Sequence, residues 1–227
     1  MSEFINTADV IGDAEMCDQI IMRTVTEYKE NRITQVGRRA LCDCTKLKTV
    51  ELPNVTELVG DKASGGHFSG CSALEELNMP LIKKVQGAWA FSGTTRLKTV
   101  NFPELEQLED YAFREGGLTG RVVLPKLTRI GNGTFMNCPI EILDLSAVTY
   151  INGPFEYCTS LVALIIRTPT VCTWGTNWGL PPTIMSTGTG YIYVPRALVD
   201  SYKAATNWST YAAQIRAIED YPEITGG

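Results

Sequence analysis

The sequence predicts an α/β repeat fold that is mostly β: a right-handed solenoid of about six stacked coils with short helical caps at its ends. Two observations predict this class. Pairs of apolar residues recur every 21 to 28 residues, and a large apolar residue recurs between the pairs. A unit of this length cannot enclose a core alone, so successive units must stack and bury a shared one.

One apolar pair in each unit has its members two residues apart, and a proline often follows it. Residues two apart in a strand point to the same side, so each pair predicts a short strand with an inward face. Proline then ends the strand, because it has no N–H for further pairing. These pairs are Val50/Leu52, Leu77/Met79, Val100/Phe102, Val122/Leu124, Leu143/Leu145, Leu164/Ile166 and Ile192/Val194.

A second apolar pair in each unit has its members three residues apart, as in Ile33/Val36 and Leu127/Ile130. A large residue follows each of these pairs and is expected to fill the coil from the opposite wall. This slot holds Leu41, Phe68, Phe91, Phe113, Phe135 and Phe155. Three residues later stands a slot that holds Cys44, Cys71, Cys138 and Cys158 in four of the units. Free cysteine is among the most buried residue types, so a column of packed thiols is expected.

The ends of the chain depart from the repeat and are expected to cap the exposed core. Residues 1–32 are predicted as an N-terminal cap, with a weak helical pattern from Ala14 to Tyr28, and 33–195 as the solenoid. Residues 196–227 are predicted as a C-terminal helical cap and tail. Its helices would cover Arg196 to Ala205 and a segment capped by Asn207, and Pro222 and the final glycines predict a frayed end.

The order Ile-Gly, Phe, Cys, Leu and then Val-x-Leu-Pro resembles the BspA-type leucine-rich repeats of bacterial surface proteins. The match is clear in the segment from Ile130-Gly131 through Phe135 to Cys138. The same order recurs six times over 33–195. The period also lies in the leucine-rich-repeat range. The short N-terminal segment, the repeats and the tail around Pro195 together look like copies in phage and prophage tail regions, which implies a virion-associated binding protein.

Composition limits the classes of partner and the location. Lys+Arg number 20 and Asp+Glu 25, so the net charge of −5 disfavours nucleic acid. The first thirty residues lack the basic start and apolar stretch of a secretory signal, and no apolar run is long enough to insert into a membrane. Synthesis in the host cytoplasm is therefore expected, and the resemblance to copies in phage tail regions implies a place in a virion. A bacterial cell surface is the alternative, although it requires export.

Little in the sequence indicates a catalytic site or a metal site. The one histidine, His67, excludes a site with two histidine ligands, and its nearest thiol, Cys71, occupies the packed slot. Cys42-Asp43-Cys44 lacks the spacing and the second pair of a typical zinc site. We therefore expect no catalytic residues, no metal and no cofactor, and predict that the chain is not an enzyme.

The outward strand positions become apolar toward the C-terminal end, which predicts a contact surface. Two tryptophans in the insertion after the sixth strand would extend it, since tryptophan and tyrosine are favoured binding anchors. The alternative is that this insertion folds back and covers the surface. The predicted binding residues are Val123, Ile142, Ile165, Trp174, Asn177, Trp178, Tyr191 and Tyr193.

These expectations combine into one functional prediction. The chain is a non-enzymatic binding or structural protein of a phage particle, which uses the solenoid face and inserted loops. Its partner would be a host cell-surface protein or glycan, or another virion protein, with homo-oligomers left open. The alternative is a bacterial cell-surface or secreted adhesin of the same repeat family. The sequence does not identify the ligand.

Overall fold

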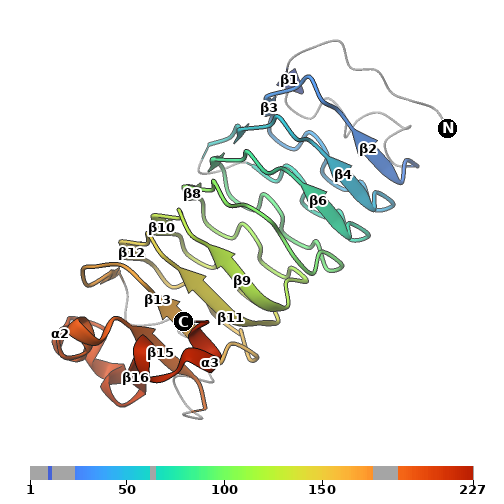
Figure 1. The fold of residues 1–227 in the computed structure, drawn as a ribbon. Coiled ribbons are helices and arrows are strands. Elements are labelled where there is room, and N and C mark those ends of the chain that lie inside the picture. Colours follow the sequence, from blue (N-terminus) through green and yellow to red (C-terminus); the bar gives the residue numbers. More distant parts are fainter. Residues whose placement is uncertain (1–9, 12–23, 62–64, 176–188, 227) are drawn as a thin grey trace.

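The computed structural model describes residues 10–11, 24–61, 65–175 and 189–226. The chain winds as one long solenoid, whose coils follow the sequence from the N-terminal to the C-terminal end (Figure 1). The predicted class, a mostly-β parallel solenoid with few short helices, is confirmed. It has about eight turns rather than six, because strands form in the first and last parts of the chain that the repeat pattern did not include.

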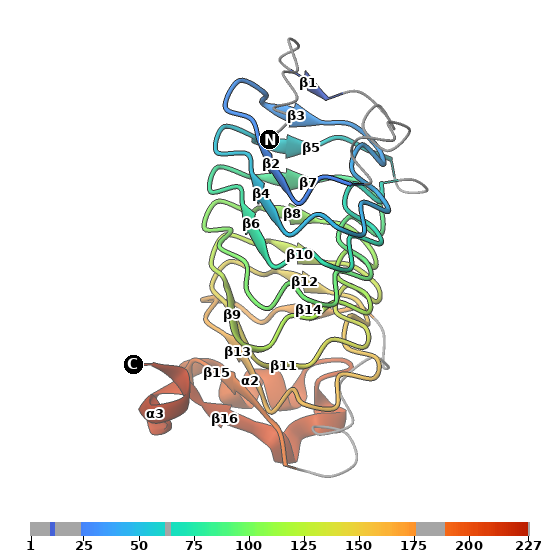
Figure 2. The same cartoon turned by 90° about the vertical axis from the view of Figure 1, so that its right-hand side faces the viewer.

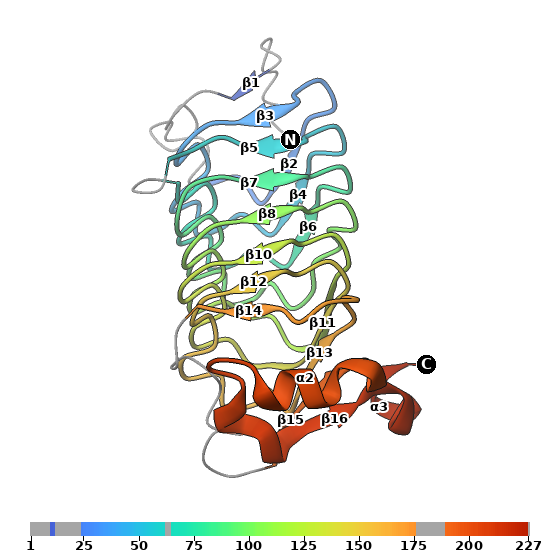
Figure 3. The same cartoon turned by 90° about the vertical axis from the view of Figure 1, so that its left-hand side faces the viewer.

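One wall is an eight-stranded parallel sheet in which every strand has two residues. Figures 2 and 3 show its strands stacked along the whole solenoid. Each strand pairs in register with its counterpart one coil further on, so that Val85 lies beside Leu108 and Leu108 beside Ile130. In order, the strands are β1 (Val10–Ile11), β3 (Gln35–Val36), β5 (Glu57–Leu58), β7 (Lys84–Val85), β8 (Gln107–Leu108), β10 (Arg129–Ile130), β12 (Tyr150–Ile151) and β14 (Thr173–Trp174).

This long sheet was not predicted, because only one strand per coil was expected. The second member of each pair spaced by three is the inward residue of a strand, and the residue before it points outward. Two residues are too few to show the alternation that identifies a strand in a sequence.

A second wall carries the predicted strands, which fall into two groups. The first is a three-stranded sheet, and the second is a five-stranded sheet. Within the described range 65–175, the coil with Val100 and Phe102 forms no ladder strand and separates the two groups. The strands are β2 (Glu27–Lys29), β4 (Thr49–Glu51) and β6 (Glu76–Asn78), then β9 (Gly120–Leu124), β11 (Ile140–Leu145), β13 (Ala163–Ile166), β15 (Tyr191–Val194) and β16 (Ile215–Ala217).

A third wall is built from tight turns around the large-residue slot. In each coil the residues two before and two after this slot have a positive φ, as at Trp89 (61°) and Gly93 (72°) around Phe91. This geometry aims backbone N–H groups at the next coil. Phe91 N–H thus donates to the Ala112 carbonyl at 2.7 Å, and Phe113 N–H donates to the Thr134 carbonyl at 2.8 Å. The turns are therefore hydrogen-bonded from coil to coil as the sheets are.

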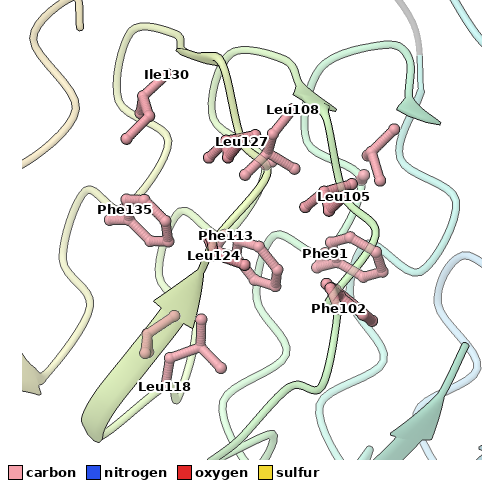
Figure 4. Close-up of a cluster of buried hydrophobic side chains, with 14 of the residues drawn as sticks. Phe91, Phe102, Leu105, Leu108, Phe113, Leu118, Leu124, Leu127, Ile130 and Phe135 are labelled. Atoms are coloured by element: carbon pink, nitrogen blue, oxygen red, sulfur yellow. The ribbon is translucent and has the colours of Figure 1, made fainter. Parts of the chain in front are cut away.

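The predicted phenylalanine slot forms a stacked column inside the solenoid (Figure 4). Ring centroids are 4.8 Å apart between Phe91 and Phe113 and 5.8 Å apart between Phe113 and Phe135, with interplanar angles of 15° and 1°. The column continues to Phe155 and Trp174 and meets Trp208 edge-on. One continuous core therefore joins the repeats to the C-terminal cap.

The C-terminal cap differs from its prediction in detail. It comprises η2 (Arg196–Leu198), α2 (Val199–Ala204), η3 (Ser209–Gln214), η4 (Ile218–Asp220) and α3 (Pro222–Thr225), with β16 between η3 and η4. Asn207 does not cap a helix: its φ is 65°, and its side-chain amide donates to the Trp174 carbonyl at 2.9 Å. The expected frayed end is wrong for residues 222–225, since α3 packs back on the solenoid and the Thr225 side chain is fully buried, whereas Gly227 lies outside the described residues.

The N-terminal range also departs from its prediction. β1 pairs with β3 and β2 pairs with β4, so strand pairing begins inside the range expected to be a cap. The helical reading is wrong at Glu27 and Tyr28, which lie in β2. The remainder of that predicted helix, through residue 23, lies outside the described residues.

Candidate binding surface

The structure places the predicted binding residues in very different surroundings. Val123 is 46% exposed on β9, whereas Ile165 and Tyr193 are 0% and 2% exposed. Ile142 and Tyr191 are partly buried beside them. Trp174 is buried between Phe155 and Trp208 in the core. Asn177 and Trp178 lie outside the described residues. The expected exposure is therefore wrong for Ile165, Tyr193 and Trp174.

The C-terminal segment covers the apolar part of this sheet face. Ile218, Tyr221 and Ile224 pack on the cluster that contains Ile165 and Tyr193. The rings of Tyr193 and Tyr221 meet edge-on with centroids 5.4 Å apart. The covering segment is Ile218–Thr225, whereas the insertion named in the alternative lies outside the described residues from 176 to 188. We call the covering segment the C-terminal latch.

A cluster of three charged side chains holds the end of the latch. The buried Asp144 carboxylate accepts two hydrogen bonds from Arg167, at 2.8 Å and 3.0 Å, and also pairs with Arg121. The hydrogen bond to Asp144 raises the pKa of the Arg167 guanidinium. Arg121 donates to the carbonyls of Ile224 and Thr225, both at 2.8 Å, and Arg167 also donates to Thr225. Charge-assisted bonds of this kind are strong and fix geometry.

The thiols of the cysteine slot are structural. Cys71, Cys138 and Cys158 are buried, and their sulfurs donate to the carbonyls of Leu41, Phe113 and Phe135 at 2.8 to 2.9 Å. Burial raises the pKa of Cys158 to about 12. A hydrogen bond with Cys44, together with burial, raises that of Cys71 well above its usual value. Protonated thiols are poor nucleophiles and poor metal ligands.

His67 is also placed as a packing residue. Its side chain is fully buried, and Nε2–H donates to the Val59 carbonyl at 2.8 Å. This bond ties the start of the insertion at 59–65 to the solenoid. The buried imidazole and the buried, protonated Cys71 thiol do not provide the exposed thiolate that a Cys–His nucleophile needs.

The face of the eight-stranded sheet remains open. One outward residue per strand forms a line along the solenoid, and every described member is exposed or partly exposed. Arg129 lies over the Tyr150 ring at 4.3 Å, and Gln35 donates to Glu57 at 3.1 Å. We call this line the outer column; its described side chains are Gln35, Glu57, Lys84, Gln107, Arg129, Tyr150 and Thr173.

Sequence reasoning missed the outer column because it assigned no strand there. The signal was present: each member immediately precedes the second residue of a pair spaced by three. A regular line of polar and charged residues beside a buried apolar column indicates a solvent-facing row.

Two further findings concern the described residues. Among them, no three histidine, cysteine, aspartate or glutamate side chains gather as a metal site would require. In the same part of the chain, no helix has the length and apolar character to cross a membrane.

A family model matches most of the chain. The model of the BspA type leucine rich repeat region matches residues 22–141 and 90–173, with six copies. Together these ranges run from 22 to 173, about two thirds of the 227 residues. No curated protein matches the chain.

Comparison with solved structures also gives matches. One is a leucine rich cell surface protein from Faecalibacterium prausnitzii A2-165, with 18% identity and a TM-score of 0.55. The match covers 85% of this chain and 48% of that one, so this chain spans about half its length. A leucine-rich repeat protein from Bacteroides ovatus ATCC 8483 has 19% identity and a TM-score of 0.34, over 82% of this chain and 63% of that one. The structure from Faecalibacterium prausnitzii is described as a cell surface protein and not as a virion protein, so the expected phage origin gains no support from it.

Proposed function

The chain belongs to the BspA-type leucine-rich repeat family, and from that premise we propose that it is an adhesin-like binding module of a bacterial cell surface. The proposed role is recognition of protein partners, without enzymatic activity. The cell-surface description of the structure from Faecalibacterium prausnitzii supports this location better than a virion.

The observation that carries the proposal is the outer column. It runs across seven successive coils whose sheet is unbroken from β3 to β14, and no described element covers it. Stacked repeats commonly use such extended surfaces for binding. By contrast, the latch covers the apolar face, and the described thiols and the imidazole are buried.

The outer column indicates what kind of partner it fits. Its charges have both signs, with Glu57 beside Lys84 and Arg129 further along, and Tyr150 adds an aromatic ring. Charges of both signs give specificity and orientation for a folded protein surface of complementary pattern. With two basic side chains and one acidic side chain, the column lacks the large basic excess that nucleic-acid binding needs.

Binding to cells tests the proposal. Fluorescently labelled protein is titrated onto cultured epithelial cells and onto bacterial cells, before and after the cells are treated with protease. We expect saturable binding that protease treatment abolishes. The double variant Lys84→Glu/Arg129→Glu should bind at least about tenfold more weakly, because it reverses two charges of the column.

The matched control is Lys46→Glu/Lys203→Glu, which makes the same change in charge at exposed positions outside the column. It should bind as the unmodified protein does. Equal loss in both variants, or binding that survives protease treatment, would contradict the outer column as a protein-binding surface. Recovery of the chain in purified virions, with none on the producing bacterium by antibody labelling, would contradict the location.

A further inference from the structure

A depression on the turn wall is separate from the outer column and from the latch. It has a volume of about 300 Å³ and lies across three coils. Arg39 and Asp43 belong to the first coil, Gly66 and Ser69 to the second, and Trp89 to the third. Residues 39, 66 and 89 are equivalent positions, two before the large-residue slot, and all three have a positive φ. Their side chains would therefore form one column, in which Gly66 leaves a gap.

Trp89 forms the floor of this gap. Its ring stacks on Tyr111 of the following coil, with centroids 5.7 Å apart and an interplanar angle of 9°. Tyr111 is held in turn by Asn132, whose side-chain amide donates to the phenol oxygen at 2.8 Å. One face of the indole is thus supported, and the side toward Gly66 lines the depression. Trp89 is 37% exposed, which is high because tryptophan is on average a largely buried residue.

Arg39 and Asp43 supply the polar groups above the gap. Both side chains are exposed, and among the described residues no ion pair or hydrogen bond holds the Arg39 guanidinium. The Asp43 carboxylate lies over Gly70, where a β-carbon would lie 2.3 Å from Oδ1. The Cys42 thiol points to its other oxygen at 3.8 Å. Glycine at position 70 therefore lets the carboxylate stay at the mouth of the depression.

The height of the gap fits a single ring. Neighbouring coils lie about 4.8 Å apart, so Arg39 and Trp89 are separated by roughly 10 Å with no side chain between them. The local charges of Arg39 and Asp43 cancel, which favours a neutral ligand over a phosphate or a nucleotide. A carboxylate, a guanidinium and a hydroxyl together accept and donate hydrogen bonds, as a ligand rich in hydroxyl groups requires.

We propose that this depression is a carbohydrate-binding slot that holds one pyranose ring. The apolar C–H face of the sugar packs on Trp89, and its hydroxyl groups bond to Asp43, Arg39 and Ser69. Such a combination of one apolar surface and a few placed polar groups is typical of small-molecule sites. The slot would add glycan binding to the protein binding proposed for the outer column, and it lies on a different wall of the solenoid.

The test uses substitution of the glycine that creates the gap. Asparagine tolerates a positive φ, and a β-carbon at Gly66 would lie 3.5 Å from Ser69 Cβ and 3.7 Å from Arg39 Cγ, both ordinary contacts. Gly66→Asn should therefore fold and fill the slot. The matched control is Gly120→Asn, at a φ of 63° with nothing within 4 Å of the new β-carbon.

The probes are the methyl pyranosides of glucose, galactose, mannose and N-acetylglucosamine, titrated into the full chain labelled with nitrogen-15. We expect at least one to shift the indole N–H resonance of Trp89 saturably. Gly66→Asn should weaken that binding at least about tenfold, and Gly120→Asn should leave it unchanged. No shift with any of the four probes, or equal affinity in Gly66→Asn, would overturn the proposal.

Two further variants keep the test decisive if Gly66→Asn fails to fold. Trp89→Ala should lose binding as measured by calorimetry, whereas Tyr157→Ala, which removes another exposed aromatic ring of the turn wall, should keep it. Retained binding in Trp89→Ala would overturn the slot. The charge-reversed outer-column variant should bind the sugar normally, so failure of one proposal is distinguishable from failure of the other.

Discussion

Phe113 shows how single residues stabilise the solenoid. Its ring is fully buried and stacks on Phe91 on one side and on Phe135 on the other. Phe113→Ala would leave a cavity in the middle of this column, because the hydrogen-bonded coils on either side restrict collapse. We expect the free energy of unfolding to fall by about 3–5 kcal/mol, measured by urea denaturation.

The control for this change is Tyr157→Ala. Tyr157 is 59% exposed, so its loss should alter the free energy of unfolding by less than about 0.5 kcal/mol. Similar costs for the two variants would show that Phe113 does not lie in the core column.

The buried thiols give a pH dependence of stability. Burial raises the pKa values of Cys158 and Cys172 from 9.0 to about 12, and that of Cys138 also rises. Between pH 9 and pH 12 the unfolded chain loses these protons while the folded chain keeps them. Below pH 9 the buried thiols therefore make their full contribution to the free energy of unfolding. Between pH 9 and pH 12 this free energy falls by about 1.4 kcal/mol per pH unit for each such thiol.

Urea denaturation at a series of pH values, compared with the Cys138→Ala/Cys158→Ala variant, measures this effect. The variant should show a shallower decline above pH 9. Identical slopes would indicate that the two thiols already ionise in the folded protein.

At the scale of residues, the sequence predicted which side chains point inward but not what covers the outward ones. The burial of the phenylalanine and cysteine slots was predictable from their period. The burial of Ile165 and Tyr193 was not, because alternation along a strand assigns a side chain to a face and says nothing of a distant segment that packs on it. The buried Asp144 between Arg121 and Arg167 likewise requires three different coils to be in register.

Among the elements, the C-terminal latch has the clearest separate role. A chain that ends at Ala217 would lose the latch and expose Ile165, Tyr193 and their neighbours on the sheet face. It would also deprive Arg121 and Arg167 of the Ile224 and Thr225 carbonyls to which they donate. We expect this truncated protein to bind an apolar fluorescent dye strongly and to self-associate in analytical ultracentrifugation, since large exposed apolar patches promote association.

A chain that ends at Thr225 provides the matched control, because it keeps η4, α3 and the contacts of Tyr221 and Ile224. It should remain dye-negative and unchanged in mass. If the protein ending at Ala217 behaves in the same way, the latch does not shield the sheet face.

Strands with a strong local sequence pattern were predicted, and strands with a weak one were missed. Pairs spaced by two and ended by proline were correctly assigned as strands, apart from the coil with Val100 and Phe102. The two-residue strands of the long sheet were missed, since their pairing comes from the neighbouring coils and not from their own sequence. Asn207 was misassigned because a residue type that favours helix caps also favours a positive φ.

For the whole molecule, the repeat determined the architecture and left the function open. Stacked coils bury a common core whatever their surface carries, so the inward pattern predicts the fold alone. The candidate sites depend on outward residues that need not repeat, such as Trp89, Arg129 and Gly66. Only the stacked coils show which of these outward residues are neighbours, because equivalent positions of successive coils then lie side by side.

The central claim is that successive units stack in register, and chemical cross-linking of the long sheet tests it most directly. Cysteines are placed in pairs at Lys84, Gln107 and Arg129, which lie on β7, β8 and β10, and are treated with dibromobimane, which bridges only nearby thiols. The account predicts fluorescent cross-links for Lys84→Cys/Gln107→Cys and Gln107→Cys/Arg129→Cys, whose strands are adjacent. It predicts none for Lys84→Cys/Arg129→Cys, which are two coils or about 10 Å apart. Cross-linking of the distant pair with none in the adjacent pairs would contradict it.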